Sequence, residues 1–184
     1  MSSNIKEKIL LLRLQKRDPE AFAQLYDLYV ASIYRFILFK VPTRQDAEDL
    51  TSEVFLKTWQ YIGEAGNNVG NFRSLLYASA RNLVVDFYRR RSQGEMIGDE
   101  EVLLQLEDSR QQNFLNQIDA KADVKNLESC LRRLKDEYRD VIILRFLDEL
   151  SISEIAEVLN KSKGSVRVLI HRALKVVKEL ISQS

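Results

Sequence analysis

The sequence contains a single cysteine, a single histidine, two prolines and six glycines in 184 residues. A lone cysteine excludes an internal disulfide framework and fits a reducing compartment. One histidine and one cysteine are too few ligands for a typical zinc or catalytic metal centre, so a hydrolase or metal enzyme is not expected. The scarcity of proline and glycine, together with periodic apolar patterns, favours an all-helical fold. We therefore expect no cofactor, no metal site and no catalytic residue in this chain.

Long apolar runs are also lacking, because no run approaches the roughly 20 residues that cross a bilayer. Residues 1–18 carry charges throughout their apolar part and show no pattern for signal-peptide cleavage. These features predict a cytoplasmic protein without membrane insertion. The hydrophobic content of 45% and charged content of 30% are typical of a globular chain that can bury a core in one or two domains.

The formal net charge of +1 conceals strongly charged segments. Residues 71–91 contain five arginines and one aspartate, whereas residues 93–120 contain seven acidic residues and one arginine. A basic segment attracts a polyanion and an acidic segment repels it. We therefore predict an all-α fold of two small helical domains joined by an acidic linker. The expected boundaries are 1–92 for the first domain, 93–120 for the flexible linker and 121–184 for a domain that contains a helix-turn-helix.

The clearest local pattern is the helix-turn-helix of residues 151–178. Ser151 and Glu154 have the spacing of a capping box, and residues 160–163 are polar enough to form the turn. In the helix that follows, apolar side chains recur on one side, with Leu169 and Leu174 among them, and basic side chains recur on the other. That division is typical of a helix that docks on its domain and enters the major groove. The residues expected to face DNA are Lys163, Ser165, Arg167, Val168, His171, Arg172 and Lys175.

A second basic surface is predicted on the helix from Phe72 to about Arg91. Its three terminal arginines exceed what helix-end capping requires, and Asn82, Asp86 and Arg89 share one face, which favours a surface that follows phosphates. The loop before it, residues 63–71, lacks the lysine and the serine or threonine of a phosphate-binding loop, so nucleotide binding is not expected there.

The helix from about Arg44 to Ile62 carries an exposed leucine between acidic residues. Its outward face contains Asp49, Glu53 and Leu56, a pattern that fits a protein interface and equally fits an ordinary surface leucine. Spacing alone does not decide between the two. The apolar arc predicted to face the core is Ala47, Leu50, Val54, Thr58 and Tyr61.

Four segments together resemble an extracytoplasmic-function sigma factor of the sigma-70 family, over nearly the whole chain. They are DPEAFAQLYDLY (18–29), DAEDLTSEVFLKTW (46–59), SLLYASARNLVVDFYRRR (74–91) and LKDEYRDVIILRFLDELSISEIAEVLNKSKGSVRVLIHRA (134–173). The resemblance implies a non-enzymatic transcription initiation factor that binds core RNA polymerase, recognises −35 duplex DNA and opens −10 DNA. The partners that it implies are core RNA polymerase, promoter DNA and an anti-sigma factor, with no small-molecule substrate.

The resemblance also assigns residues to these surfaces. The loop at 63–72 would capture an unstacked −10 base, and the basic face of the last helix would read the −35 element. The residues implied for core polymerase binding are Asp46, Asp49, Glu53, Leu56 and Lys57. The residues implied for −10 DNA binding are Asn71, Phe72, Arg73, Ser79, Asn82, Asp86, Arg89 and Arg90.

Two other hypotheses accompany this interpretation. A free-standing helix-turn-helix repressor or activator is the alternative function, although such proteins usually dimerise on paired half-sites and no dimerisation heptads are evident. The apolar patch at residues 102–106 suggests in addition a segment that folds back on a domain and contributes self-inhibition.

Overall fold

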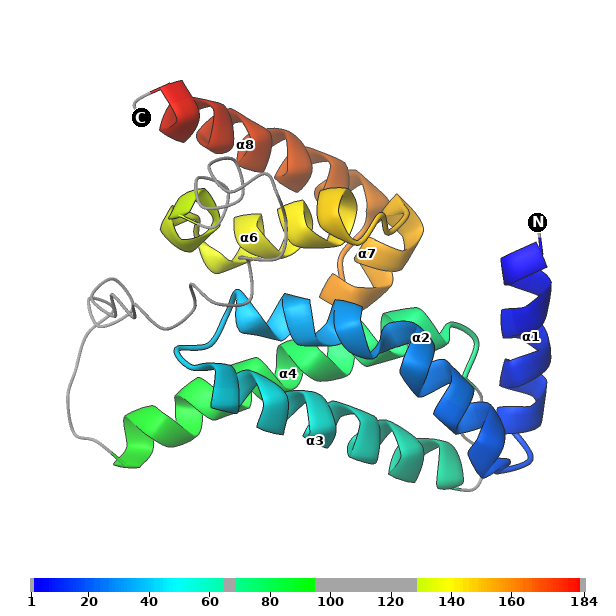
Figure 1. Ribbon diagram of the computed structural model, residues 1–184. Coiled ribbons are helices and arrows are strands. Elements are labelled where there is room, and N and C mark those ends of the chain that lie inside the picture. Colours follow the sequence, from blue (N-terminus) through cyan, green and yellow to red (C-terminus); the bar gives the residue numbers. More distant parts are fainter. Residues whose placement is uncertain (1, 65–68, 95–128, 183–184) are drawn as a thin grey trace, which may run out of the picture.

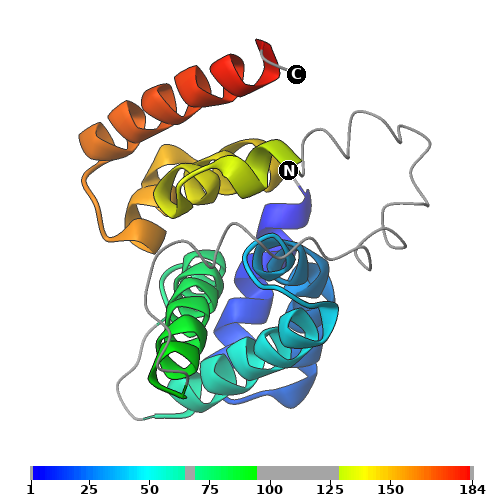
Figure 2. The same cartoon turned by 90° about the vertical axis from the view of Figure 1, so that its left-hand side faces the viewer.

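The computed structural model describes residues 2–64, 69–94 and 129–182, and within them the chain forms helices and connecting turns without a strand. Figures 1 and 2 show two groups of helices that lie against each other. The first group comprises α1 (Ser2–Leu14), α2 (Pro19–Leu38), α3 (Arg44–Gly63) and α4 (Phe72–Gly94). The second comprises α6 (Asp136–Ile142), the π-helical turn η4 (Ile143–Leu147), α7 (Ile152–Leu159) and α8 (Lys163–Ser182). The predicted all-α fold with two helical domains is confirmed.

Local capping explains where the helices of the first group begin. The Asp18 carboxylate accepts hydrogen bonds from the amides of Glu20 and Ala21, and Pro19 occupies the first helical position of α2. The pKa of Asp18 is lowered, chiefly because the Arg13 guanidinium donates a hydrogen bond to it at 2.7 Å. Thr43 caps α3 by accepting from the amide of Asp46 at 3.1 Å. The side chains fully buried at the centre of this group include Leu25, Ile33, Phe36, Leu76 and Tyr77.

One residue of the predicted α3 core arc lies elsewhere. Ala47, Leu50, Val54 and Thr58 are buried as expected, but Tyr61 is exposed and Ile62 is buried in its place. The prediction for Tyr61 was therefore wrong. A helix of 3.6 residues per turn drifts relative to a fixed stripe, so by the last turn of α3 the inward position has moved by one residue.

The second group contains the predicted helix-turn-helix. Ser151 and Glu154 form the expected capping box at the start of α7, with hydrogen bonds of 3.2 and 2.8 Å. Asn160 ends α7 in the left-handed region at φ 50°, a conformation that asparagine adopts more readily than most residues. Ser162 then accepts from the amide of Ser165 at 3.1 Å at the start of α8. The single cysteine, Cys130, is buried as a free thiol, and burial raises its pKa.

A π-helical turn places Phe146 at the surface. Its spacing from Val141 and Ile142 in a regular α-helix would put it on the core side, yet Phe146 is 50% exposed. Residues Ile143–Leu147 form η4, in which the amide of Asp148 donates to the carbonyl of Ile143 five residues earlier. The wider turn rotates Phe146 away from the core and leaves Ile143 and Leu144 fully buried.

The two helix groups pack directly on each other, with α7 against α4. The proposed acidic linker at 93–120 falls almost entirely outside the described residues, as do the apolar patch at 102–106 and residues 65–68 of the glycine-rich loop. Among the helices that are described, none is long and apolar enough to cross a membrane.

Candidate nucleic-acid interface

The helix α8 lies along the outer edge of the molecule (Figure 1), and its exposed side chains include Arg167, Arg172 and Lys175. Val166, Ile170 and Ala173 are buried against the rest of the second group, so the opposite side of the helix is free. Positive charge gathered on an exposed helix that follows a short capped turn is suited to phosphates and base edges in a major groove. All seven residues predicted to face DNA are exposed: Lys163, Ser165, Arg167, Val168, His171, Arg172 and Lys175.

The two leucines of α8 that were predicted on the docking side behave differently. Leu169 is partly buried against the core, as expected. Leu174 is 42% exposed, so its predicted place on the docking side was wrong. Ala173, its neighbour, occupies the fully buried position instead, and adjacent helical residues point about 100° apart.

On α4, the residues predicted to contact −10 DNA do not share one surface. Asn82, Arg89 and Arg90 are exposed, and Arg89 forms an ion pair with Asp86 at 3.0 Å. Ser79 is partly buried. The remaining predicted residues lie at the first turn of the helix, where their surroundings differ.

The first turn of α4 is built around a cap and a buried ring. Asn71 caps α4, because its side-chain oxygen accepts from the amide of Ser74 at 3.0 Å. Phe72 is only 1% exposed and lies against the rings of Phe22 and Tyr29, with centroid distances of 6.5 and 5.9 Å. In this arrangement the enclosed ring of Phe72 is not available to stack on a base, so the predicted −10 contact would require the ring to leave the core.

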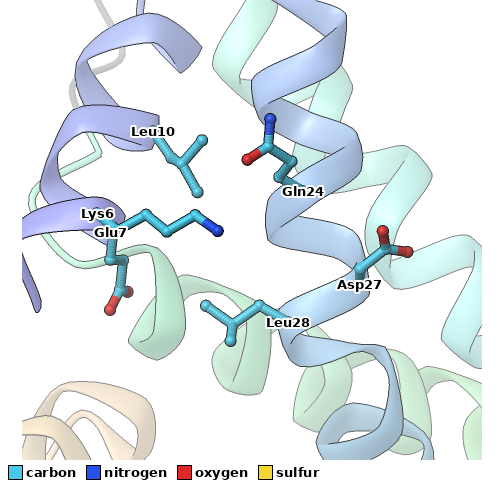
Figure 3. Close-up of a pocket in the computed structure, with 6 residues that line it drawn as sticks. All are labelled: Lys6, Glu7, Leu10, Gln24, Asp27 and Leu28. Carbon is cyan, nitrogen blue, oxygen red and sulfur yellow. The ribbon is translucent and has the colours of Figure 1, made fainter. Parts of the chain in front are cut away.

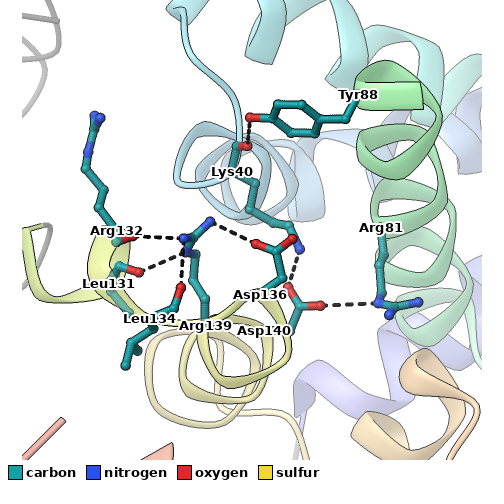
Figure 4. A network of polar contacts seen from close by, with 9 residues as sticks. All are labelled: Lys40, Arg81, Tyr88, Leu131, Arg132, Leu134, Asp136, Arg139 and Asp140. Carbon is teal, nitrogen blue, oxygen red and sulfur yellow. Dashed lines mark hydrogen bonds and ion pairs between the residues drawn. The ribbon is translucent and has the colours of Figure 1, made fainter. Parts of the chain in front are cut away.

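Two arginines of the basic α4 segment face the second helix group instead of solvent. Arg73 donates to the backbone carbonyl of Asp148 and lies 3.9 Å from the Glu154 carboxylate. Arg81 pairs with the buried Asp140 carboxylate at 3.2 Å, in the network shown in Figure 4. In this arrangement neither side chain is placed to meet a phosphate.

The α3 face predicted as a partner interface is exposed. Leu56 is 57% exposed, and Asp49 and Lys57 on the same side are exposed as well. Lys57 pairs with the partly buried Glu53 at 2.9 Å. Asp46 belongs to the cap, because it accepts from the Thr43 hydroxyl at 2.6 Å. This exposure makes the face available to a partner, although other apolar side chains, such as Leu12 and Leu28, are exposed to a similar degree.

The hollows on the surface are shallow and mixed in character. One, of about 340 Å³, lies between α1 and α2, where Lys6, Glu7, Leu10, Gln24, Asp27 and Leu28 line it (Figure 3). Another, of about 320 Å³, lies between α3 and α4 and is lined by Leu50, Leu83, Phe87, Arg90 and Arg91. Across residues 2–64, 69–94 and 129–182, no three histidine, cysteine or acidic side chains gather in a way that could hold a metal ion.

Sequence reasoning missed four charged residues that join the two helix groups. Lys40 pairs with Asp140, and Arg35 pairs with Asp148. Both aspartates are almost fully buried although they carry charge. A weak signal was present, because Asp140 precedes the apolar run Val141–Leu144, but its partners Lys40 and Arg81 are 100 and 59 residues away and no local pattern identifies them.

Comparison with known families matches the two helix groups separately. Residues 25–93 match the family described as Sigma-70 region 2, and residues 125–177 match Sigma-70, region 4. Together these two matches take in about two thirds of the chain, in the order region 2 and then region 4.

Two curated relatives align with most of the chain. The ECF RNA polymerase sigma factor BldN of Streptomyces coelicolor is 34% identical over 178 residues, which cover 94% of this chain and 64% of BldN. The ECF RNA polymerase sigma factor SigW of Bacillus subtilis is 29% identical over 185 residues, which cover 97% of each chain. The chain thus spans nearly the full length of SigW and somewhat under two thirds of the length of BldN.

Two solved structures share the fold. CnrH, solved in complex with the cytosolic domain of CnrY, matches with a TM-score of 0.72 at 20% identity over 97% of this chain and 99% of CnrH. The sigma factor RpoE, in complex with the anti-sigma factor NepR from Bartonella quintana, matches with a TM-score of 0.66 at 20% identity over 88% and 96% of the two chains. At this identity the likeness concerns the fold alone.

Proposed function

The chain belongs to the extracytoplasmic-function group of the sigma-70 family, and from this membership we propose that it is a promoter-specific transcription initiation factor. It binds core RNA polymerase and directs it to promoters through −35 and −10 DNA. The observation that carries the proposal is the occurrence of region 2 and region 4 matches in one chain, in that order. A free-standing repressor or activator would account for the helix-turn-helix but not for region 2, so that alternative is not favoured.

The work is divided between the two domains. Residues 1–92 bind core polymerase and −10 DNA, residues 121–184 bind −35 DNA, and the acidic residues 93–120 join them. Because an acidic joining segment is repelled by DNA, it leaves the phosphates to the basic helices on either side. Bacterial RNA polymerase and chromosomal DNA are both in the cytoplasm, so the proposed function places this chain in the cytoplasm.

In the −35 complex, α8 enters the major groove with its basic face. The exposed side chains of Arg167, His171 and Lys175 lie at intervals of four residues, so they follow one side of the helix along the groove. Lys163 and Ser165 belong to the first turn, where the free amides of a helix favour phosphate.

In the −10 complex, Asn82, Arg89 and Arg90 supply the exposed polar and cationic groups of α4. Ser79 and Asp86 lie beside them on the same helix. Asn71, whose side chain caps α4, holds the end of the loop that would receive an unstacked base. Unpairing a base costs a few kcal/mol and stacking or pocketing it returns about 1–3 kcal/mol, so phosphate contacts must offset the remainder. Arg73 and Arg81 would add to those contacts once they leave their partners in the second domain.

The polymerase-facing surface consists of Asp46, Asp49, Glu53, Leu56 and Lys57. In this surface Leu56 is the apolar centre and the charges around it are the rim. Such a rim accelerates encounter and selects the partner, whereas a central apolar anchor supplies much of the affinity.

Reversal of two charges in this surface tests the proposal. We expect core RNA polymerase to capture the wild-type chain at moderate salt, and we expect Asp49→Arg/Glu53→Arg to reduce the affinity at least about tenfold, because like charges then face each other at the interface. A pull-down with purified core polymerase, followed by titration, measures the effect. The matched control is Glu20→Arg/Asp27→Arg, which makes the same change in charge on the exposed side of α2 and should be captured normally.

Capture of neither the wild type nor the control would refute the proposed function. Capture of all three variants with equal affinity would leave the function in place and refute this surface.

Replacement of Arg167 by alanine tests the −35 surface. If the guanidinium contacts a phosphate, the variant holoenzyme should bind a promoter fragment several-fold more weakly, and the slope of log K against log salt should fall by about 1. The fragment is one selected by the wild-type holoenzyme from a random library. Arg133→Ala removes the same charge from an exposed site of the second domain and should leave the slope unchanged. An unchanged slope in Arg167→Ala would mean that no phosphate contact is lost.

An anti-sigma factor is the remaining partner in the proposal. The solved structure of RpoE, which has the same fold, contains such a partner, the anti-sigma factor NepR, and CnrH was solved with the cytosolic domain of CnrY. A protein that covers the exposed α3 face would compete with core polymerase for Leu56 and its neighbours. The chain itself needs no cofactor, substrate or catalytic group for any of these roles.

A further inference from the structure

We propose that a seam of ion pairs and hydrogen bonds, centred on two buried aspartates, holds the two domains of the free protein in a closed arrangement that withholds part of the −10 surface from DNA. We define the seam by six residues, namely Arg35, Lys40, Arg73 and Arg81 of the first domain and Asp140 and Asp148 of the second. The inference rests on the proposed function for its meaning in transcription, but the closed arrangement itself is testable without polymerase.

The first half of the seam is centred on Asp140 (Figure 4). Its carboxylate binds the ammonium of Lys40 with one oxygen and the guanidinium of Arg81 with the other, the latter at 3.2 Å. Lys40 ends the turn after α2, and its carbonyl accepts from the Tyr88 hydroxyl of α4 at 2.7 Å. One aspartate of α6 therefore ties together α2 and α4 of the other domain.

The second half of the seam is centred on Asp148. Its carboxylate binds Arg35 of α2, and its backbone carbonyl accepts from Arg73 of α4. Arg73 also approaches Glu154 of α7. The Tyr77 hydroxyl is buried nearby, and its pKa is raised by that burial and by the negative charge of Asp148. Every basic residue of the seam thus comes from the first domain and every acidic residue from the second.

Burial makes these pairs specific to one arrangement. Asp140 and Asp148 are 1% and 5% exposed, and a buried carboxylate without a partner is strongly unfavourable. The same pairs contribute little net stability, since the cost of removing both ions from water offsets much of their attraction. A seam of this kind selects the closed geometry while staying easy to open, because charged groups exchange their partners for water when the domains separate.

The closed arrangement is incompatible with simultaneous binding of both promoter elements. Elements centred about 25 base pairs apart are separated by about 85 Å along straight B-form DNA, at about 3.4 Å per base pair. A compact chain of this length has a radius of gyration of about 16 Å and is roughly 40 Å across. The roughly 34 residues between the described domains permit a reach of up to about 110 Å by covalent geometry. The domains must therefore separate before both elements are bound.

The seam covers one functional surface and leaves two free. Arg73 and Arg81, which would otherwise meet −10 phosphates, are occupied by carboxyl and carbonyl oxygens. Leu56 on α3 and the basic face of α8 remain exposed. Polymerase can therefore engage α3 while the protein is closed, and opening releases the two arginines for DNA.

The test uses two double variants that open the seam from opposite sides. Asp140→Asn/Asp148→Asn removes both acidic centres, and Arg35→Gln/Lys40→Gln removes two of their partners. The matched control is Asp136→Asn/Glu137→Gln, which neutralises two carboxylates of the same helix, α6, whose partners Arg139 and Lys161 lie within the second domain. Circular dichroism and thermal unfolding establish that each full-length variant is folded, and the second opening variant keeps the test valid if the first does not fold.

The distance between the domains is measured by pulsed electron paramagnetic resonance with spin labels on α3 and α8. Cys130→Ala removes the native thiol, and Gln60→Cys with Glu179→Cys places the labels at exposed sites. The wild type and the control should give one short, narrow distance distribution, and both opening variants a longer and broader one. An unchanged distribution in the folded opening variants would overturn the closed arrangement.

The inhibitory role is measured on the unlabelled proteins with a 20-nucleotide single-stranded DNA. If about one molecule in ten of the wild type is open, full opening raises the apparent affinity about tenfold. Arg35→Gln/Lys40→Gln is the decisive variant, because it loses two positive charges and should still bind DNA more tightly. Longer distances without that gain would overturn inhibition. Failure of the wild type to capture core polymerase would refute the proposed function while leaving the distance result intact.

Discussion

Replacement of Phe72 by alanine is expected to lower the free energy of unfolding by about 3–5 kcal/mol, the range found for large-to-small substitutions at buried aromatic positions. Phe72 is almost completely enclosed at the first turn of α4. Its ring meets Phe22 edge to face at an interplanar angle of 88° and lies beside Tyr29. Truncation would leave a cavity where α2 and α4 meet, and both the lost burial and the lost ring contacts destabilise the first domain.

Denaturant titration of the full-length chain measures this loss, with Phe146→Ala as the matched control. Phe146 is half exposed in η4, so the same truncation there should cost about 1 kcal/mol or less. Phe72→Leu separates the structural role from a role in DNA binding, since leucine keeps most of the buried volume but cannot stack on a base. If Phe72→Leu were stable yet lost −10 DNA binding, the ring would contact DNA in the complex and its assignment to the core would be incomplete.

Signals between neighbouring residues determine where several helices of this fold begin, but they do not determine the direction of Phe72. The cap of α4 by Asn71, the capping box of Ser151 and Glu154, and the cap of α2 by Asp18 all depend on residues within four positions of each other. Such signals are readable from one sequence, and the capping box of Ser151 and Glu154 is present as predicted. The direction of Phe72 depends instead on a hydrophobic space between α2 and α4, which no local pattern describes.

The π-helical turn is a second feature that periodicity could not predict. A pattern of 3.6 residues per turn places Phe146 with Val141 and Ile142, and one hydrogen bond from Asp148 to Ile143 changes that register. The polar seam is a third. Its pairs join residues 59 to 113 positions apart, and the sequence shows only that charges of opposite sign exist in the two halves.

The surfaces themselves were easier to predict than their state in the free protein. The exposed residues of α8 and the leucine-centred face of α3 follow from amphipathic spacing, because solvent-facing positions on a helix repeat with the helix. Whether Arg73 and Arg81 meet solvent, DNA or another domain depends on the docking of α7 on α4. That docking is a relation between domains, and it lies beyond the reach of spacing within either one.

A large effect is also expected from replacing Arg139 with alanine, which should lower the free energy of unfolding of the second domain by roughly 2–4 kcal/mol. Its guanidinium is the hub at the left of the network in Figure 4 and donates to three backbone carbonyls, those of Leu131, Arg132 and Leu134, at 2.8–3.1 Å. It also pairs with Asp136 at 3.2 Å. The carbonyls of Leu131 and Arg132 lie in the last turn of the helical segment at 129–133, where few backbone donors remain, and that of Leu131 also accepts from the Leu134 amide at 3.2 Å.

Thermal and denaturant unfolding of Arg139→Ala, compared with Arg133→Ala, measures the contribution of this hub. Arg133 carries the same charge on the same segment but is exposed, so its loss should change stability by no more than about 0.5 kcal/mol. Arg139→Lys should fall between the two, because an ammonium keeps the charge but cannot reach three carbonyls with the planar fork of a guanidinium. Equal losses in the alanine and lysine variants would show that neither the charge nor the alkyl stem stabilises the turn without the guanidinium fork, and wild-type stability of both would show that the hub contributes nothing. A graded loss would instead identify Arg139 as the residue that holds the turn before α6. That turn sets the direction of α6 and so places Asp140 of the seam against the first domain.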